Sequence, residues 1–218
     1  MSGTGPAFDL SGGALCLDFT NTLAGRPRKP RDDVRDYGDF LEFGRQAIDL
    51  EEVTRLGLVR AAQRRPALAR AALRRAVALR ESLYAIFSSV AGGREPPIED
   101  LEVLNKTLRR ALAHLVVTRT PGGFAWDWSG GGEGLDRVLW PVSRSAADLL
   151  TSDDRERVRE CASETCRWLF LDRSPSRRRR WCDMKVCGNR AKARRHYHRT
   201  KDLKEGTDVH AGRAAGSP

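Results

Sequence analysis

Apolar and polar residues alternate near the start of the chain. Over residues 14–22 the apolar side chains fall on one side of an extended chain and the others on the opposite side; they are Leu15, Leu17 and Phe19 against Cys16, Asp18 and Thr20. An alternation with a period of two is typical of a half-buried strand. We therefore expect a strand over residues 14–22.

A spacing of three and four residues replaces this alternation further along the chain. Apolar residues recur in this way over residues 37–48, 79–90 and 101–115, which predicts three amphipathic helices. The middle helix is expected to begin near Pro66, because the fixed φ and missing N–H of proline suit the first turn of a helix.

A short hairpin and one more helix complete the first part of the pattern. Residues 116–128 contain a Pro-Gly-Gly turn at 121–123, followed by alternating aromatic residues, and this predicts a β-hairpin. A further helix is expected over residues 135–150. Residues 1–154 are thus predicted to form a helix-rich α+β domain with a small strand and hairpin element.

The charge of the chain is unevenly distributed. The 218 residues carry a formal net charge of +10. Residues 1–154 contain 21 basic and 21 acidic side chains, whereas residues 155–218 contain 18 basic and 8 acidic ones. A coding bias toward arginine does not explain this asymmetry, so the last third of the chain is expected to meet an anionic partner.

No segment predicts membrane insertion or export. No uncharged apolar run approaches the roughly 20 residues that cross a bilayer. The N-terminus has no basic region followed by an apolar stretch, as a signal peptide would. We expect a cytoplasmic protein without a membrane partner.

Four of the five cysteines form two identical pairs. The spacing is C-x4-C in each pair, with 15 residues between them, and the residues are Cys161, Cys166, Cys182 and Cys187. Disulfides are improbable in a reducing compartment, and two short-spaced pairs are typical of four thiolates around one structural zinc ion. Free or redox-active cysteines are the alternative. Zinc is preferred to an iron–sulfur cluster, because four thiolates without a special intervening pattern suit a redox-inert ion.

Basic residues cluster around the second cysteine pair. A helix expected over residues 188–201 contains no acidic residue, and its cations include Arg190, Lys192, Arg194, Arg195 and Arg199. A helix that is polar on every side cannot stabilise itself, but metal binding next to its start would support it. The preceding loop adds Arg177, Arg178, Arg179 and Arg180. Arginine forks bind phosphate and the edge of guanine, so we predict nucleic-acid contact here, with a solvated basic surface as the alternative.

The fold class predicted from these elements is α+β. The helix-rich N-terminal domain is followed by a small C-terminal zinc-ribbon or treble-clef-like module, over residues 155–204, that ends in the basic helix. Residues 205–218 are rich in Gly, Ala and Ser and are expected to be a disordered tail.

Both parts of the chain contain short sequence motifs. The C-terminal motifs are Cys161-x4-Cys166, Trp168-Leu-Phe-Leu-Asp172, Arg179-Arg180-Trp181-Cys182 and Cys187-Gly188-Asn189-Arg190-Ala191-Lys192. Together they resemble the CGNR zinc-finger family of bacterial proteins. In that family the finger follows an ABATE domain, and the segment Leu15-Cys16-Leu17-Asp18-Phe19-x-Asn21-Thr22-Leu23 is similar to the opening of that domain. The resemblance implies an ABATE-like domain over residues 1–154, zinc at the four cysteines, nucleic-acid contact by the helix of Arg190, and a role in stress-induced transcription.

A few residues of the N-terminal domain have two interpretations. Asp18, Asn21 and Thr22 are candidates for lining a small-ligand pocket, and a turn held by side-chain hydrogen bonds to the backbone is the alternative. Cys16 is interpreted as a small buried hydrophobic residue. A role as a redox sensor is the alternative interpretation. No catalytic constellation of Ser, His and Asp and no phosphate-binding glycine loop is present in the sequence, so we do not expect an enzyme.

These observations predict a zinc-dependent DNA-binding transcriptional regulator. Its N-terminal domain would bind a small-molecule effector or form a homodimer. An RNA-binding protein with the same zinc module is the second hypothesis. A third is an enzyme that the finger only localises. DNA is the preferred partner over RNA.

Overall fold

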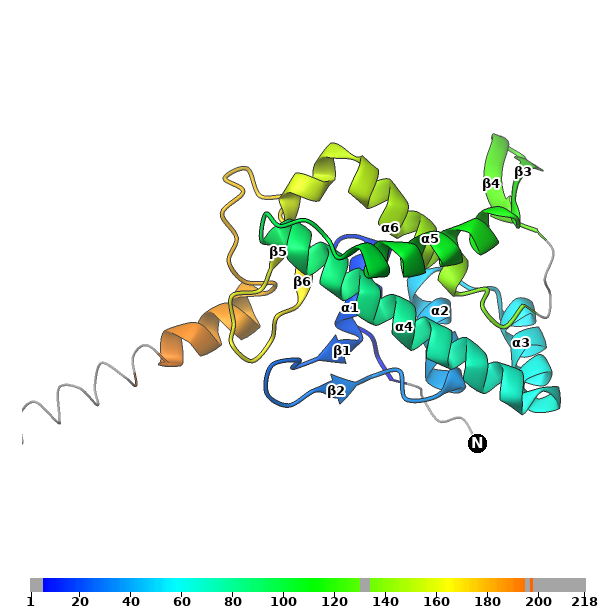
Figure 1. Cartoon of the computed structure of the whole chain (residues 1–218), viewed down its shortest axis with the longest axis horizontal. Helices are drawn as coiled ribbons and strands as arrows, with labels where there is room; N and C mark the ends of the chain where they lie inside the picture. The colour runs from blue at the N-terminus through cyan, green and yellow to red at the C-terminus, as the bar shows by residue number, and fades with distance from the viewer. Residues whose placement is uncertain (1–5, 130–133, 195–196, 198–218) are drawn as a thin grey trace, which may run out of the picture. The chain divides into compact units, whose positions relative to one another are not determined.

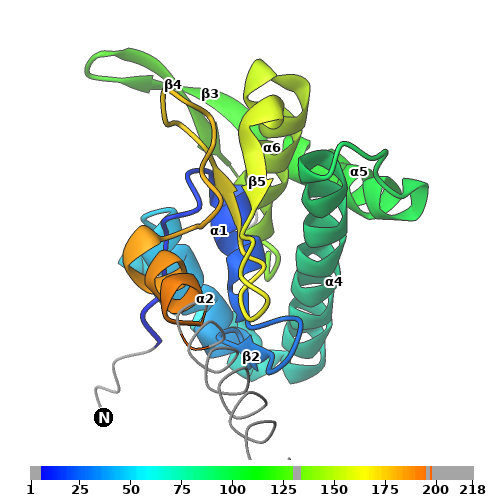
Figure 2. The ribbon, with the colours of Figure 1, turned by 90° about the vertical axis from the view of Figure 1, so that its left-hand side faces the viewer.

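A computed structural model describes residues 6–129, 134–194 and 197 of the chain. It contains helices and antiparallel strand pairs, so the predicted α+β class is confirmed. The chain divides into two compact units, Met1–Cys182 and Asp183–Pro218. Figures 1 and 2 show the elements of the first unit, which runs from α1 to β6.

The predicted N-terminal strand is wrong, because this segment is the helix α1 (Leu15–Asn21). From Cys16 to Asn21 every residue of α1 is buried, so the helix has no polar face and its sequence lacks a helical period. It packs against α4, α6 and β6. Complete burial between these elements, rather than local preference, decides the conformation of this short segment.

Four further helices share one hydrophobic core with α1. They are α2 (Tyr37–Ala47), α3 (Glu52–Arg64), α4 (Pro66–Ala91) and α6 (Leu139–Thr151). Phe19 of α1 packs against Phe40 and Phe43 of α2, with ring centroids 6.3 and 5.2 Å apart. Pro66 opens α4 as predicted, whereas the sequence pattern did not predict α3 as a separate helix.

The helix α5 (Ile98–Leu112) packs against α4 and α6 and leads into a hairpin. The hairpin pairs β3 (Leu115–Thr120) with β4 (Gly123–Trp128), which confirms the predicted hairpin. Its inner end is held at α6, where the ring of Trp128 lies 6.0 Å from that of Trp140.

The third strand pair lies within the region predicted as the C-terminal module. A short 3-10 helix η1 (Asp153–Arg157) leads into β5 (Val158–Glu160), which pairs with β6 (Leu169–Leu171). Val158 and Leu169 are fully buried in the same hydrophobic core as α1 and α4. The side-chain amide of Asn21 donates to the carbonyl of Leu169 at 2.9 Å, and the amide of Leu169 donates back to Asn21 at 3.0 Å. This hairpin is therefore an integral part of the first unit.

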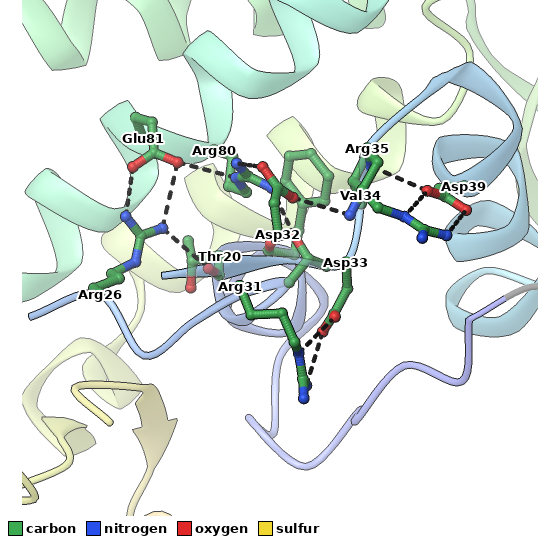
Figure 3. Close-up of polar contacts among 12 residues, drawn as sticks. Thr20, Arg26, Arg31, Asp32, Asp33, Val34, Arg35, Asp39, Arg80 and Glu81 are labelled. Atoms are coloured by element: carbon green, nitrogen blue, oxygen red, sulfur yellow. Dashed lines mark hydrogen bonds and ion pairs between the residues drawn. The ribbon is translucent and has the colours of Figure 1, made fainter. Parts of the chain in front are cut away.

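A buried arginine joins α4 to the β1–β2 segment (Figure 3). The strands β1 (Leu23–Ala24) and β2 (Arg31–Asp32) pair with each other. Arg80 of α4 is 2% exposed, and its guanidinium donates to both carboxylate oxygens of Asp32 at 2.7 Å and to Glu81 at 3.0 Å. Because both partners are carboxylates, the buried charge is compensated. Burial alone would raise the pKa of Asp32, but the hydrogen bond and charge of Arg80 lower it.

The second unit begins with a short π-helical turn, η2 (Met184–Gly188), and residues 189–194 continue as α-helix. The side chain of Asp183 accepts from the amide of Val186 at 2.7 Å and caps this turn. The helix therefore begins earlier than the predicted residue 188. The rest of the predicted basic helix and the predicted tail lie outside the described residues, apart from Tyr197.

Candidate metal centre and its basic surroundings

The first cysteine pair occupies a knuckle between β5 and β6. Cys161 follows β5 directly, and its amide donates to the carbonyl of Trp168 at 2.8 Å. The amide of Cys166 donates to Ser163 at 3.0 Å and closes the turn. Arg167 then takes a φ of 64°, in the left-handed region, and this reverses the chain into β6.

The second pair flanks the start of the second unit. Cys182 is buried, and nearby the amide of Ala162 donates to the carbonyl of Arg180 at 2.9 Å. Cys187 is buried within η2, where its amide donates to Asp183 at 3.0 Å.

The sulfur atoms of the four cysteines gather at one point. Those of Cys161, Cys166, Cys182 and Cys187 all lie within 4.8 Å of one another, and those of Cys166 and Cys182 are 3.6 Å apart. A tetrahedral zinc ion with Zn–S bonds of about 2.3 Å needs sulfur atoms about 3.8 Å apart. The four thiols thus fit one structural Zn²⁺, as predicted.

The pKa values of the clustered cysteines shift in opposite directions, downward for Cys161 and upward for Cys166 and Cys182. The pKa of Cys161 is lowered, because its sulfur accepts hydrogen bonds from Cys166 and Cys182 and from the amides of Cys182 and Ser163. The pKa of Cys166 is raised, chiefly because it donates to Cys161. Zinc binds thiolates, and backbone donors to the sulfur atoms stabilise that charge. The backbone donors at Cys161 therefore suit a sulfur that binds a metal as thiolate.

A carboxylate next to the first zinc ligand connects the knuckle to α4. Glu160 accepts from the hydroxyl of Tyr84 at 2.9 Å and from that of Ser88 at 2.8 Å, both on α4. Arg167, at the far end of the knuckle, lies 2.8 Å from the same carboxylate. The sequence does not predict this connection, since nothing in the local pattern shows which residue faces Glu160.

The arginine-rich loop of residues 173–180 is organised by a buried carboxylate. Asp172 is fully buried, and it accepts from the amide of Ser174 at 3.0 Å, from its hydroxyl at 2.6 Å and from the amide of Arg179 at 2.8 Å. Burial alone would raise the pKa of Asp172, but these hydrogen bonds lower it. The carboxylate is therefore ionised and holds both ends of the loop.

The four predicted arginines of this loop are not equivalent. Arg177, Arg178 and Arg180 are exposed. Arg179 is half-buried, and its guanidinium lies 4.7 Å from the ring centre of Phe170 and donates to the carbonyl of Cys182. Arg179 thus ties the loop to the backbone of a zinc ligand. Among its exposed neighbours, Arg180 lies 5.4 Å from the ring centre of Trp181.

Only part of the predicted basic helix is described. Arg190 and Lys192 are exposed and Arg194 is half-buried, all three within the helical residues 189–194. Arg195 and Arg199 lie outside the described residues.

Asp18, Asn21 and Thr22 are all buried and hydrogen-bonded to the backbone. Asp18 accepts from the amide of Gly12 at 2.7 Å, Asn21 pairs with Leu169 as described above, and Thr22 donates to Phe19 at 2.8 Å. These bonds favour the structural interpretation, and the ligand pocket at these residues stays a prediction. Burial, with a smaller contribution from Asp9, raises the pKa of Asp18 to about 6 against the bond from Gly12.

Cys16 is fully buried, and burial raises its pKa to about 12. This environment suits the small buried hydrophobe of the sequence analysis, because a redox sensor needs an accessible thiolate.

A pocket of about 310 Å³ lies elsewhere, at the C-terminal end of α2. Its lining residues come from the α2–α3 connection, α3, β4 and the region around the start of α6: Ile48, Asp49, Leu50, Glu51, Thr54, Asp127, Trp128, Arg137 and Pro141. No motif in the sequence predicts this pocket.

Comparisons with known proteins match both parts of the chain. The model of the ABATE family, described as "Putative stress-induced transcription regulator", matches residues 13–153. That of the CGNR zinc finger matches residues 157–200. No curated protein matches the chain. In the described part of the chain, no helix combines the length and apolar character needed to cross a membrane.

Proposed function

This chain belongs to the ABATE family and carries a CGNR zinc finger, and from this premise we propose that it is a zinc-dependent DNA-binding transcription regulator. In this proposal the finger binds DNA, the domain over residues 1–154 senses a small-molecule effector or forms a homodimer, and neither part is catalytic. The module over residues 155–204 acts in the cytoplasm, where thiols stay reduced and free to bind zinc.

The observation that carries the proposal is the arginine loop beside the metal centre. Arg177, Arg178 and Arg180 are exposed in a loop held by the buried carboxylate of Asp172. Ordered arginines lose less conformational freedom on binding phosphate than arginines on a mobile chain. The basic residues Arg190, Lys192, Arg194, Arg195 and Arg199 extend the contact in this proposal.

Arg179 has a different role in the proposal from the other residues of the loop. Its contacts with Phe170 and with the carbonyl of Cys182 support a structural role. We therefore assign phosphate contact to Arg177, Arg178 and Arg180, and loop positioning to Arg179.

The test uses the zinc-loaded full chain in a selection from random duplex DNA, followed by binding measurements at several salt concentrations. An enriched sequence motif is expected. The variant Arg177→Ala/Arg178→Ala should reduce the slope of log K against log salt by about two units, since each lost phosphate contact contributes about 0.9.

The matched control removes the same charge from exposed positions on α3 and α4, as Arg60→Ala/Arg70→Ala. It should leave the slope unchanged. A selection without an enriched motif, combined with stronger competition by structured RNA than by duplex DNA, would favour the RNA-binding hypothesis. If both double variants show the same slope of log K against log salt, Arg177 and Arg178 do not contact DNA.

A further inference from the structure

One face of the β3–β4 hairpin carries apolar side chains that are exposed to solvent. Val117 is 59% exposed, Phe124 79% and Trp126 61%. Val117 and Trp126 are directly opposite each other in the hairpin, and Arg144 of α6 lies over the Trp126 ring at 5.1 Å. Figure 1 shows the two strands beyond the end of α5. Single exposed apolar residues are ordinary, but three on one small face indicate an interaction surface.

The outer edge of β4 offers unpaired backbone groups next to these side chains. Opposite residues of an antiparallel pair alternate between hydrogen-bonded and non-bonded positions. Ser129 lies opposite His114 in this register, and its amide donates to the carbonyl of His114 at 2.8 Å, so this pair is hydrogen-bonded. Every second residue back along β4, Asp127 and Ala125, is then also at a hydrogen-bonded position. Ala125 therefore bonds inward to β3, whereas the amides and carbonyls of Phe124 and Trp126 point outward.

These groups are self-complementary about a two-fold axis at Ala125. In an antiparallel pair of two β4 strands centred there, Phe124 of one copy lies opposite Trp126 of the second copy. Both of these residues have outward-pointing backbone groups, so the four hydrogen bonds of two bonded pairs form. Directly opposite residues share a face of the sheet, so all four aromatic rings lie together. Asp127, the one charged residue of β4, falls opposite Gly123 of the second copy, and no like charges meet.

We propose that two copies of this chain associate through β4, forming a four-stranded antiparallel sheet across the two-fold axis. The two rings of each copy expose on the order of 300 Å², which sets an upper limit of roughly 600 Å² on the ring area that the pair of copies can bury. Stable interfaces bury about 1,200–2,000 Å², so the association is weak and depends on protein concentration. This inference concerns the free protein and does not depend on nucleic-acid binding.

The first experiment is sedimentation of the zinc-loaded full chain up to a concentration of roughly 0.5 mM, where a millimolar Kd is measurable. The native protein is expected to show a monomer–dimer equilibrium. Phe124→Lys/Trp126→Lys should weaken it at least tenfold, since lysines then face each other across the axis. Phe124→Lys/Trp126→Glu should associate more strongly than the double-lysine variant, because each introduced lysine then faces an introduced glutamate, but more weakly than the native chain, because the rings are gone and exposed ion pairs contribute little.

Each result of this series supports or overturns the proposal. A native chain that stays monomeric, or a dimer that survives both substitutions to lysine, overturns it. A lysine–glutamate variant that associates no better than the double-lysine variant overturns the register, because a two-fold axis at Trp126 would bring like charges together. Circular dichroism and zinc content should match those of the native chain in each variant, since the altered side chains are exposed.

A cross-link tests the same register independently. Ala125 lies at a non-bonded position of the proposed pair, where the two Cα atoms are about 4.5 Å apart, within the range that a disulfide bridges. Ala125→Cys should form a covalent dimer in oxidised glutathione, whereas Asp127→Cys, an exposed position on the same strand, should not. Equal cross-linking of the two variants would contradict the register.

Discussion

Replacing Asn21 by alanine tests whether the zinc-binding region and the helical domain form one folding unit. The side chain of Asn21 on α1 makes two buried hydrogen bonds with the backbone of Leu169 on β6, at 2.9 and 3.0 Å. They join residues 148 positions apart in the sequence. In Asn21→Ala the amide and the carbonyl of Leu169 both lose their partner in a region without solvent, because Leu169 is fully buried.

The magnitude follows from these two groups. A buried donor or acceptor left without a partner costs about 1–3 kcal/mol, so losing the partners of both groups should lower the free energy of unfolding by roughly 2–6 kcal/mol. A domain of this kind has a total stability of about 5–15 kcal/mol. The variant should therefore unfold at a clearly lower urea concentration. Asn21→Asp should also destabilise, because a carboxylate accepts from the amide of Leu169 but cannot donate to its carbonyl.

The assay is urea unfolding of the zinc-loaded chain, followed both by circular dichroism and by zinc release to a coloured chelator. The matched control is Asn105→Ala on the exposed face of α5, which should change the stability by less than about 0.5 kcal/mol. The two signals should shift together in Asn21→Ala. If this variant unfolds like Asn105→Ala, or if only zinc release shifts, the hairpin and the helices are not one unit and the reasoning fails.

Three further predictions concern the buried charges and the metal. Arg80→Met should lower the free energy of unfolding by about 1–3 kcal/mol, because the hydrogen bonds of the buried guanidinium to Asp32 are lost while the carboxylate, which is 35% exposed, stays partly solvated. Arg28→Met, at an ion pair in which both side chains are 64% exposed, should cost less than about 1 kcal/mol in the same urea assay. The pKa of Asp18 is raised to about 6 in the folded state, above its value in the unfolded chain, so its contribution to stability is fully present below about pH 4 and is lost as the pH rises through 6. Asp18→Asn should therefore gain stability relative to the native chain between these pH values, by up to about 3 kcal/mol, and a difference that does not vary with pH would contradict this assignment. Removing zinc with a chelator should lower the melting temperature recorded from the helical signal, since β5 and β6 are part of the unit Met1–Cys182, and an unchanged helical transition after metal loss would show independent folding.

Amphipathic elements could be predicted from the sequence because the spacing of their apolar residues shows which side of the element is buried. The helix α4 has one buried and one exposed face, and it begins at Pro66 as expected. The hairpin of β3 and β4 was predicted from its turn residues. The four cysteines were predicted to meet because metal chemistry fixes their type and spacing, so only the identity of the ligands was needed.

The errors fall where tertiary contacts replace the local pattern. The helix α1 is buried from Cys16 to Asn21, so its apolar and polar residues do not mark a buried and an exposed side. The alternation that suggested a strand therefore did not indicate the conformation of this segment. The strand β5 is three residues long, too short to show a period. The roles of Asp172 and Arg179 depend on residues that the loop brings back over Phe170, and no local spacing encodes that contact.

Two connections determine how the first cysteine pair is attached to the helices. One runs from Asn21 of α1 to the backbone of β6, three residues beyond Cys166. The other runs from Tyr84 and Ser88 of α4 to Glu160, the residue before Cys161. A movement of α1 or α4 must therefore strain the knuckle or break hydrogen bonds, of which the two buried ones between Asn21 and Leu169 cost about 1–3 kcal/mol each. If the protein is a regulator as proposed, an effector that shifts these helices acts on the zinc ligands through packed structure rather than through a flexible linker.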